Sequence, residues 1–357
     1  MSRPFASALI DTYNHERFIE EAIISVLEQD FPASEMEVLV VDDGSTDRTP
    51  EIVRKFEPRV RLIRKPNGGQ ASAFNAGVPQ SRGEIVAFLD GDDWWAQGKL
   101  TAVAEALCTN PIVGLVGHGI TEIFSDGRCH TELLREEPRF RINSPQGARA
   151  FRLRKSFLGT SRMTCRKELL LRIGAIPEAL QFQADEFLFT MAAVFADVLI
   201  LRQSFTFYRY HQNNFFQVNA HQDDPQLLRR KQRILTTLAD LLAARLANER
   251  VPEKISNIVV SSVRAEADEL RLMIDSGPPW ETVSAEFRTF RIHEPDASLV
   301  RWLTKALILA PALLLPSRTY YRLRQKIASN PSYAKARKRW IPTHEPRHVD
   351  RYRAVGP

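Results

Sequence analysis

The chain has 357 residues, of which 44% are hydrophobic and 26% are charged, a composition that excludes wholesale disorder and, at this length, suggests about two domains. The net charge of +6 is unevenly placed, because residues 318–353 contain eleven Lys and Arg but only two acidic residues. The rest of the chain is slightly acidic, so we expect an anionic partner at the C-terminal end.

Short apolar runs alternate with segments of helical periodicity over the first hundred residues. Strands are predicted at residues 6–10, 38–41, 60–63 and 85–89, with helices at 16–29, 49–56 and 72–78 between them. This alternation predicts an α/β domain with a mostly parallel sheet that helices cover on both faces. From residue 101 the pattern is looser, with strands predicted at 113–116 and 198–201 and helices at 144–151 and 167–173.

The composition favours helices beyond residue 220. We predict a catalytic domain over residues 1–220 and a helical region over 221–357, with long helices at 227–248 and 259–274 and a break at residues 277–279. Residues 299–315 are apolar, and a basic run follows at 335–340. Three interpretations stay open: a helix lying in a membrane interface, a core helix followed by a solvated basic tail, or a basic run that binds an anionic lipid-linked acceptor. No recognised module accompanies the charge, so we expect no nucleic acid.

Targeting signals are missing from the sequence. Residues 1–10 lack the features of a signal peptide, and no run of about 18 uncharged apolar residues predicts a transmembrane helix. The three cysteines, Cys108, Cys129 and Cys165, have neither paired nor metal-like spacing, which predicts reduced thiols. We therefore expect a cytoplasmic protein, with a peripheral position at the inner face of the cell membrane left open.

Acidic clusters follow the second and the fourth predicted strands. They are Asp42-Asp43 and Asp90-Gly91-Asp92-Asp93. Ligands of open parallel sheets bind at the carboxyl ends of the strands, where clustered carboxylates repel one another unless a cation neutralises them. A divalent cation would also leave coordination sites for phosphate oxygens. A turn with a helix N-cap explains the first cluster alone and a solvated turn explains the second, but two clusters at one sheet edge favour a metal site.

The loops of the common nucleotide-binding enzymes are missing. Neither a Gly-rich P-loop nor a G-x-G-x-x-G motif follows the first strand, where residues 11–15 read DTYNH. A kinase, an ATPase or a dinucleotide enzyme of the common kinds is therefore disfavoured.

Four motifs resemble those of family 2 glycosyltransferases in sequence, order and spacing. They are LIDTYN at residues 9–14, VVDDGSTD at 40–47, NGG at 67–69 with NAG at 75–77, and GEIVAFLDGDD at 83–93. The resemblance implies a GT-A fold, here with a C-terminal helical extension. It also implies inverting transfer from a nucleotide sugar, most often a UDP-sugar.

The resemblance also assigns roles in binding the donor. It places Thr12 and Tyr13 near the nucleotide base and Asp43 on the uridine. Asp90 and Asp92 form the family's D-x-D element beside the nucleotide, with Asp92 or Asp93 on Mg²⁺ or Mn²⁺. Gln70 and Asn75 are candidates for further donor contacts, with a purely structural role as the alternative for each. Asp11 departs from the family pattern, which usually has Pro or Thr at this position.

An inverting transfer needs a general base to take the proton of the acceptor hydroxyl. The resemblance places this base in residues 183–189, QADEFLF, where Asp185 and Glu186 are both candidates and Asp185 is slightly preferred. An acid at a helix start also compensates the helix dipole, which is the alternative for both residues. In residues 208–214, Arg209 or His211 could reach the diphosphate, with a structural role as the alternative.

These features predict a metal-dependent inverting glycosyltransferase. Its acceptor would be a saccharide or a lipid-linked hydroxyl, in the synthesis of cell-surface polysaccharide or glycolipid. One alternative is a sugar-phosphate nucleotidyltransferase, which would typically have a Gly-rich loop with Arg or Lys after its first strand. The other is a non-catalytic sugar-nucleotide-binding protein, which the intact acidic residues argue against.

Overall fold

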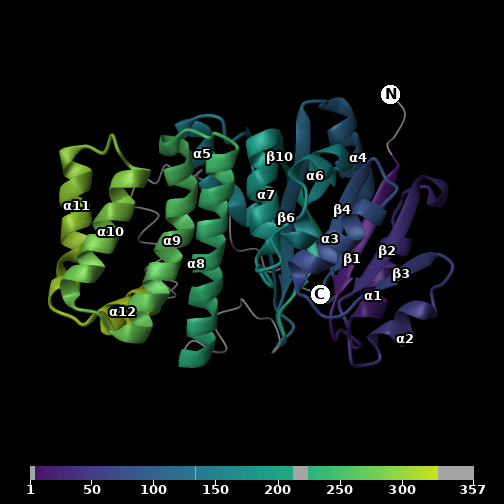
Figure 1. Ribbon diagram of the computed structural model, residues 1–357, viewed down its shortest axis with the longest axis horizontal. Coiled ribbons are helices and arrows are strands. Elements are labelled where there is room, and N and C mark those ends of the chain that lie inside the picture. The colour runs from purple at the N-terminus through teal and green to yellow at the C-terminus, as the bar shows by residue number, and fades with distance from the viewer. Residues whose placement is uncertain (1–4, 133, 212–223, 329–357) are drawn as a thin grey trace. The chain divides into compact units, whose positions relative to one another are not determined.

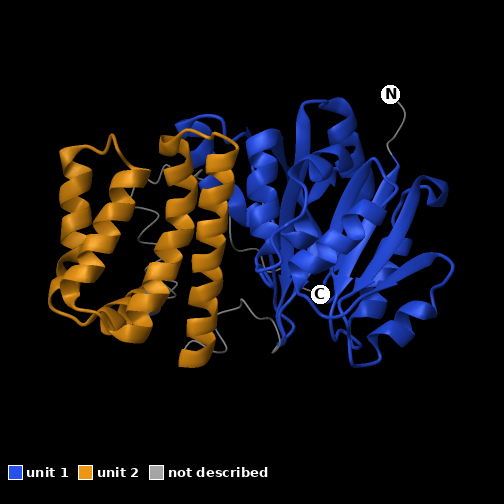
Figure 2. Cartoon of the chain, viewed as in Figure 1, with its two compact units in different colours: residues 1–214, 348–357 blue, residues 215–347 orange. Residues whose placement is uncertain are grey.

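The computed structural model describes residues 5–132, 134–211 and 224–328 of the chain (Figure 1). The described residues fall into two compact units, one formed by residues up to 211 and the other by residues 224–328 (Figure 2). The first unit contains the predicted sheet and the second contains helices.

The first unit is built on one mixed sheet. Its strands are β1 (Ala6–Thr12), β2 (Met36–Asp42), β3 (Val60–Arg64), β4 (Ile85–Asp90), β5 (Trp94–Trp95), β6 (Val113–Ile123), β7 (Cys129–Thr131), β8 (Arg139–Phe140), β9 (Thr164–Arg166) and β10 (Asp197–Arg209). The order along the sheet is β3-β2-β1-β4-β9-β6-β10-β5, with β7 paired to β6 and β8 to β10. The neighbours β3, β2, β1 and β4 are parallel, and so are β6 and β10, whereas β9 and β5 run antiparallel to their neighbours.

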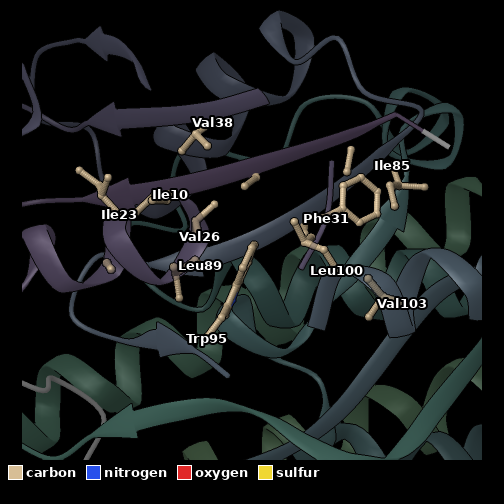
Figure 3. Packing of buried hydrophobic residues seen from close by; sticks show 14 of the residues in the cluster. Ile10, Ile23, Val26, Phe31, Val38, Ile85, Leu89, Trp95, Leu100 and Val103 are labelled. Atoms are coloured by element: carbon tan, nitrogen blue, oxygen red, sulfur yellow. The ribbon is translucent and has the colours of Figure 1, made fainter. Parts of the chain in front are cut away.

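Helices cover both faces of this sheet. They are α1 (Ile19–Leu27), α2 (Thr49–Arg54), α3 (Gln70–Gln80), α4 (Lys99–Thr109), α5 (Pro145–Arg154), α6 (Lys167–Ile173) and α7 (Ala184–Phe195). Alternate residues of a strand point to opposite faces, so Ala8 and Ile10 of β1 pack with α1, α2 and α4 in the main core (Figure 3). Leu9 points the other way, to Gly77 of α3. The predicted α/β architecture is confirmed.

The second half of the sheet differs most from the expected pattern. The sequence predicts β6 and β10 only as residues 113–116 and 198–201, but both strands are longer and run past the buried core. It does not predict β9, which has three residues and is inserted antiparallel between β4 and β6. A strand this short is below the length at which an alternating pattern can be recognised.

The second unit consists of helices. They are α8 (Pro225–Asn248), α9 (Glu253–Asp275), α10 (Pro279–His293), α11 (Leu299–Leu309), the 3₁₀ turn η5 (Ala310–Leu313) and α12 (Ser317–Ala328). The predicted break at residues 277–279 separates α9 from α10. The predicted basic run at 335–340 lies outside the described residues. Among the described helices, none combines the length and the hydropathy needed to cross a bilayer.

Candidate active site

The two acidic clusters meet at the carboxyl edge of the sheet. Strand β1 lies between β2 and β4, and its last residues pair Thr12 with Asp42 and Asp11 with Asp90. The chain then turns closely on both sides, because the Asp43 amide donates to the Thr12 carbonyl and the Gly91 amide donates to the Asp11 carbonyl, both at 2.9 Å. The sheet topology therefore brings together residues 30 and 79 positions apart, as expected for ligand sites of parallel sheets.

Asp43 holds the loop that leads into α3. Its Oδ1 accepts hydrogen bonds from Lys65 Nζ at 2.5 Å and from the Gly68 amide at 3.0 Å, and its Oδ2 accepts one from the Gly69 amide at 2.7 Å. These amides immediately precede the N-terminus of α3, where a negative charge is favourable. A uridine contact at Asp43 would share or displace one of these bonds.

Thr12 and Tyr13 lie beside this loop but differ in exposure. Thr12 is buried, with its Oγ1 3.2 Å from His15 Nδ1. The Tyr13 side chain is 45% exposed at the end of β1, which leaves its ring accessible for stacking. This accessibility is compatible with a nucleotide base at Tyr13.

Asp11 and Asp90 lie close enough to other carboxylates at this edge to be affected by their charges. Burial, followed by the charge of Asp92 and by those of Asp185 and Asp43, raises the pKa of Asp11 well above its ordinary value. Burial and the charge of Asp11 do the same to the pKa of Asp90. Asp11 Oδ1 is buried and accepts no hydrogen bond from the described residues. Crowded, under-bonded carboxylates of this kind favour a bound cation or a hydrogen-bond donor.

Asp92 and Asp93 have different surroundings. Asp92 Oδ2 lies 2.9 Å from His211 Nε2 and 3.9 Å from His15 Nε2. Burial alone would raise the pKa of Asp92, but the two imidazoles outweigh burial and lower it. Asp93 is 1% exposed, and its Oδ1 accepts from the Arg209 amide at 3.1 Å. Asp92 therefore faces the imidazoles, whereas Asp93 is turned into the protein.

The donor atoms around Asp92 fit a divalent cation that binds together with a phosphate. No group of three or more acidic, His or Cys side chains in the described residues forms a complete metal cage. Asp92 Oδ2 and His211 Nε2 nevertheless offer an oxygen and a nitrogen at one point, and a cation would replace the proton shared between them. Such a partial set leaves coordination positions for diphosphate oxygens, as is usual for Mg²⁺ sites, and its imidazole favours Mn²⁺.

The acidic pair at the start of α7 is divided between two environments. Glu186 is buried, and its Oε1 lies 2.6 Å from Lys155 Nζ in an ion pair. Asp185 Oδ2 instead accepts weak hydrogen bonds from the Thr160 amide at 3.3 Å and from its hydroxyl at 3.4 Å. Burial and the charge of Glu186 raise the pKa of Asp185 to about 6.

A short turn that carries Thr160 and Ser161 positions carboxylates on both sides of the site. Thr160 contacts Asp185, and Ser161 Oγ accepts from the Asp90 amide at 3.0 Å and lies 3.3 Å from Asp90 Oδ2. The buried Lys99 Nζ donates to the Ser161 carbonyl at 2.8 Å, and this hydrogen bond holds the turn in place. No sequence motif marks this turn. Its hydroxyl residues next to Gly159 were the only available signal.

Gln70 and Asn75 form internal hydrogen bonds. Gln70 Nε2 donates to Thr160 Oγ1 at 2.9 Å, and its Oε1 accepts from the Ala184 amide at 3.0 Å at the start of α7. Both amide atoms of Asn75 bond to the Ile176 backbone at 2.8 Å. Donor contacts by these residues would have to replace the bonds observed here.

The predicted diphosphate candidates also have defined contacts. Arg209 Nε donates to the Asp92 carbonyl at 3.1 Å, and its guanidinium lies over the rings of Phe18 and Trp94. The His211 ring packs against the Phe18 ring at a centroid distance of 4.8 Å, tilted by 33°. His15, which the sequence analysis did not single out, completes this side of the site. All three lie within reach of the Asp92 backbone or side chain.

Comparison with known proteins identifies the first unit. The model of glycosyl transferase family 2 matches residues 7–174. An uncharacterised glycosyltransferase of Nostoc is 30% identical over 213 residues, which cover 58% of this chain and 65% of that protein. The poly(ribitol-phosphate) β-N-acetylglucosaminyltransferase TarS of Staphylococcus aureus is 41% identical over 92 residues, which cover 25% of this chain and 16% of TarS. The chain thus spans less than two thirds of these relatives.

Solved structures show the same fold. The structure of TarS residues 1–349 in complex with UDP has a TM-score of 0.53 and 22% identity, with 79% of this chain and 91% of that chain covered. The mannosyltransferase PcManGT from Pyrobaculum calidifontis, in complex with GDP-Man and Mn²⁺, has a TM-score of 0.54 and 22% identity, with 96% and 89% covered. The fold is GT-A, and residues 7–174 form a domain of glycosyltransferase family 2.

Proposed function

We propose that this protein transfers a sugar from a nucleotide diphosphate, in the first place a UDP-sugar, to a hydroxyl acceptor with inversion at the anomeric carbon. The observation that carries the proposal is the meeting of Asp43, Asp90 and Asp92 with Asp185 at one sheet edge, from three separate segments of the chain. Family membership and the nucleotide complexes of TarS and PcManGT support it.

Asp185 is proposed as the general base. A base with a pKa of about 6 is ionised at neutral pH and still basic enough to accept a proton in the transition state. Its hydrogen bonds to Thr160 are long, whereas Glu186 is already neutralised by Lys155. We therefore assign the proton transfer to Asp185 and a structural role to Glu186.

The proposed reaction is a single displacement. The acceptor oxygen forms a bond to the anomeric carbon while its proton passes to Asp185. The bond between the anomeric carbon and the diphosphate oxygen breaks, and the nucleotide diphosphate leaves with the electron pair. Asp92 and His211 would hold Mn²⁺ or Mg²⁺, which when bound neutralises charge on the leaving diphosphate. Asp43 and Tyr13 would orient the nucleotide.

The acceptor is proposed to belong to a cell-surface polysaccharide or a glycolipid, at the inner face of the cell membrane. Support comes from the relatives, which include TarS and the chondroitin synthase of Pasteurella multocida, 42% identical over 94 residues that cover 26% of this chain and 10% of that protein. An acceptor of this class has the hydroxyl group that Asp185 would deprotonate.

A panel of UDP- and GDP-sugars with Mn²⁺ tests the proposal. The released product is identified for the purified chain with and without saccharide acceptors. We expect free UDP, slowly without acceptor and faster with the correct one. Pyrophosphate release with a sugar phosphate and a nucleoside triphosphate would instead identify a nucleotidyltransferase. Nucleotide binding without any turnover across the panel would identify a binding protein.

A further inference from the structure

The second unit carries an apolar row on the outward face of α11. Leu299, Val300, Leu303 and Leu307 are 73%, 71%, 61% and 75% exposed. At about 100° per residue these four positions lie on one side of the helix. Single exposed leucines are common on protein surfaces, but a continuous row marks an interaction site.

The opposite face of α11 already packs within the unit. Trp302 stacks on Phe287 at a ring distance of 5.8 Å and meets Phe290 edge-on at 4.8 Å. Leu309 is 2% exposed in a small core with Tyr320 and Tyr321. The helix therefore has two apolar faces, and packing in the unit uses only one of them. The outward row is not needed for the internal core.

The charged residues of α11 are held away from the outward row. Arg301 Nη1 lies 2.9 Å from Glu294 Oε2, and Lys305 Nζ lies 2.7 Å from Glu286 Oε2. Both cations thus bind acids of the preceding α10 segment. The outward face is left with apolar residues and the neutral Thr304. Immediately after the helix, Leu313 and Leu314 are again exposed, at 58% and 84%.

The charged residues in α11 and in the sequence after it, up to residue 344, are all basic. Residues 297–344 contain no Asp or Glu, and their ten basic residues are Arg301, Lys305, Arg318, Arg322, Arg324, Lys326, Lys335, Arg337, Lys338 and Arg339. Arg318, Arg322 and Arg324 lie on α12, which follows the exposed leucines, and Arg324 is ion-paired with Glu269 and Glu286. An uncharged apolar row followed by cations matches the boundary between lipid tails and anionic headgroups.

We propose that α11, together with Leu313 and Leu314, inserts its outward face into the headgroup boundary of an anionic lipid bilayer. A second copy of the chain is a poorer occupant, because the same stretch of a second copy has no Asp or Glu to pair with the cations of residues 318–339. The proposal gives a surface to the membrane location suggested above for the acceptor. It does not depend on the catalytic proposal, because binding to lipid is measured without a donor.

Vesicle co-sedimentation of the full chain tests the proposal. Phosphatidylcholine vesicles are compared with mixed phosphatidylcholine and phosphatidylglycerol vesicles, for the wild type and the double variant Leu303→Glu, Leu307→Glu. The matched control is Ile112→Glu, Leu171→Glu, since these apolar residues of the first unit are also exposed, at 65% and 56%. We expect salt-sensitive binding of wild type and control to the anionic vesicles, and at least about tenfold weaker binding of the Leu303, Leu307 variant.

Three results would overturn the membrane assignment. One is absence of wild-type binding to anionic vesicles, and another is equal binding of the Leu303, Leu307 variant. The third is a wild-type dimer that the variant converts to a monomer, without vesicle binding by either. Circular dichroism checks the fold, and Leu303→Ser, Leu307→Ser replaces the glutamate variant if that variant unfolds. UDP release in solution, measured on the same samples, separates failure of this proposal from failure of the catalytic one.

Discussion

At the residue scale, Asp185 and Glu186 are adjacent in sequence but differ in every contact that matters for chemistry. Glu186 is paired with Lys155, whereas Asp185 lies opposite the carboxylates of the sheet edge. We expect Asp185→Asn to lower kcat by about 10²–10⁴ with little change in thermal stability. Glu186→Gln should instead cost stability, about 1–3 kcal/mol, and keep most of the activity. Steady-state kinetics and thermal melts of both variants check this. The reverse pattern would assign the base to Glu186.

The pKa of Asp185 also predicts a pH profile. This pKa is raised from 3.8 to about 6, so the carboxyl is protonated, and inactive as a base, below that pH. The rate should therefore rise with pH through about 6 and level off toward neutrality. Initial rates measured over this window at saturating donor should have a midpoint near 6 for the wild type and a lower midpoint for Glu186→Gln, because that variant loses the Glu186 charge that helps to raise the pKa of Asp185. A rate that does not change between about pH 5 and 7 would contradict the assignment.

Asp11 is the residue at which the chain departs from its family, and its burial predicts a stability effect. Its folded-state pKa is raised, so its favourable contribution to folding is present below about pH 3.8 and is lost as pH rises through the folded-state pKa. Asp11→Asn should therefore stabilise the metal-free protein at neutral pH. We expect the free energy of unfolding to rise by about 1–3 kcal/mol and the melting temperature to rise with it. Asp126→Asn, at an exposed turn, is the control. A lower melting temperature for Asp11→Asn would show that the carboxylate is stabilised by other groups.

At the element scale, the loop before α3 depends on Gly69. Its φ is +82°, and a Cβ there would lie 2.5 Å from the Gln181 Cα. Gly127 has the same φ, but a Cβ at that position would have no atom within 4 Å. Gly127→Ala therefore isolates the backbone strain, about 1 kcal/mol, whereas Gly69→Ala adds a clash with backbone. We expect Gly69→Ala to unfold at the lower temperature and also to weaken UDP binding, because the Gly69 amide holds Asp43. Equal melting temperatures for the two variants would contradict this.

The sequence predicted elements well where a repeating pattern extends over a whole helix or strand. The strands β1 to β4 and the helices between them follow from apolar periodicity, and the two acidic clusters follow from their position at strand ends. The positions of Thr160 and Ser161 could not be predicted. Their hydrogen bonds to Asp185 and Asp90 join residues 25 and 71 positions apart. The strand that follows them, β9, has only three residues. Likewise, only the fold shows that Glu186 meets Lys155 and that Asp92 meets His211.

At the scale of the whole molecule, the two units have separate proposed tasks. The first holds the nucleotide-sugar site, and the second presents the apolar row of α11. The sequence located the apolar segment at 299–315, but left open whether it is a core helix or an interfacial one. The structure shows one apolar face of the helix in a core and another exposed, because Leu309 is buried while Leu307 is exposed. Periodicity alone cannot separate two apolar faces of this kind.

The central claim is that Asp92, at the carboxyl edge of the sheet, makes sugar transfer dependent on a divalent cation. UDP release from UDP-sugars by the full chain is measured with Mn²⁺, with EDTA, and after Mn²⁺ is restored, for wild type, Asp92→Asn and the control Asp126→Asn. We predict activity in wild type and control that EDTA removes and Mn²⁺ restores, and a loss of about 10²–10³ in Asp92→Asn with its fold intact. Activity of Asp92→Asn equal to wild type, or wild-type activity that EDTA leaves unchanged, would contradict the account.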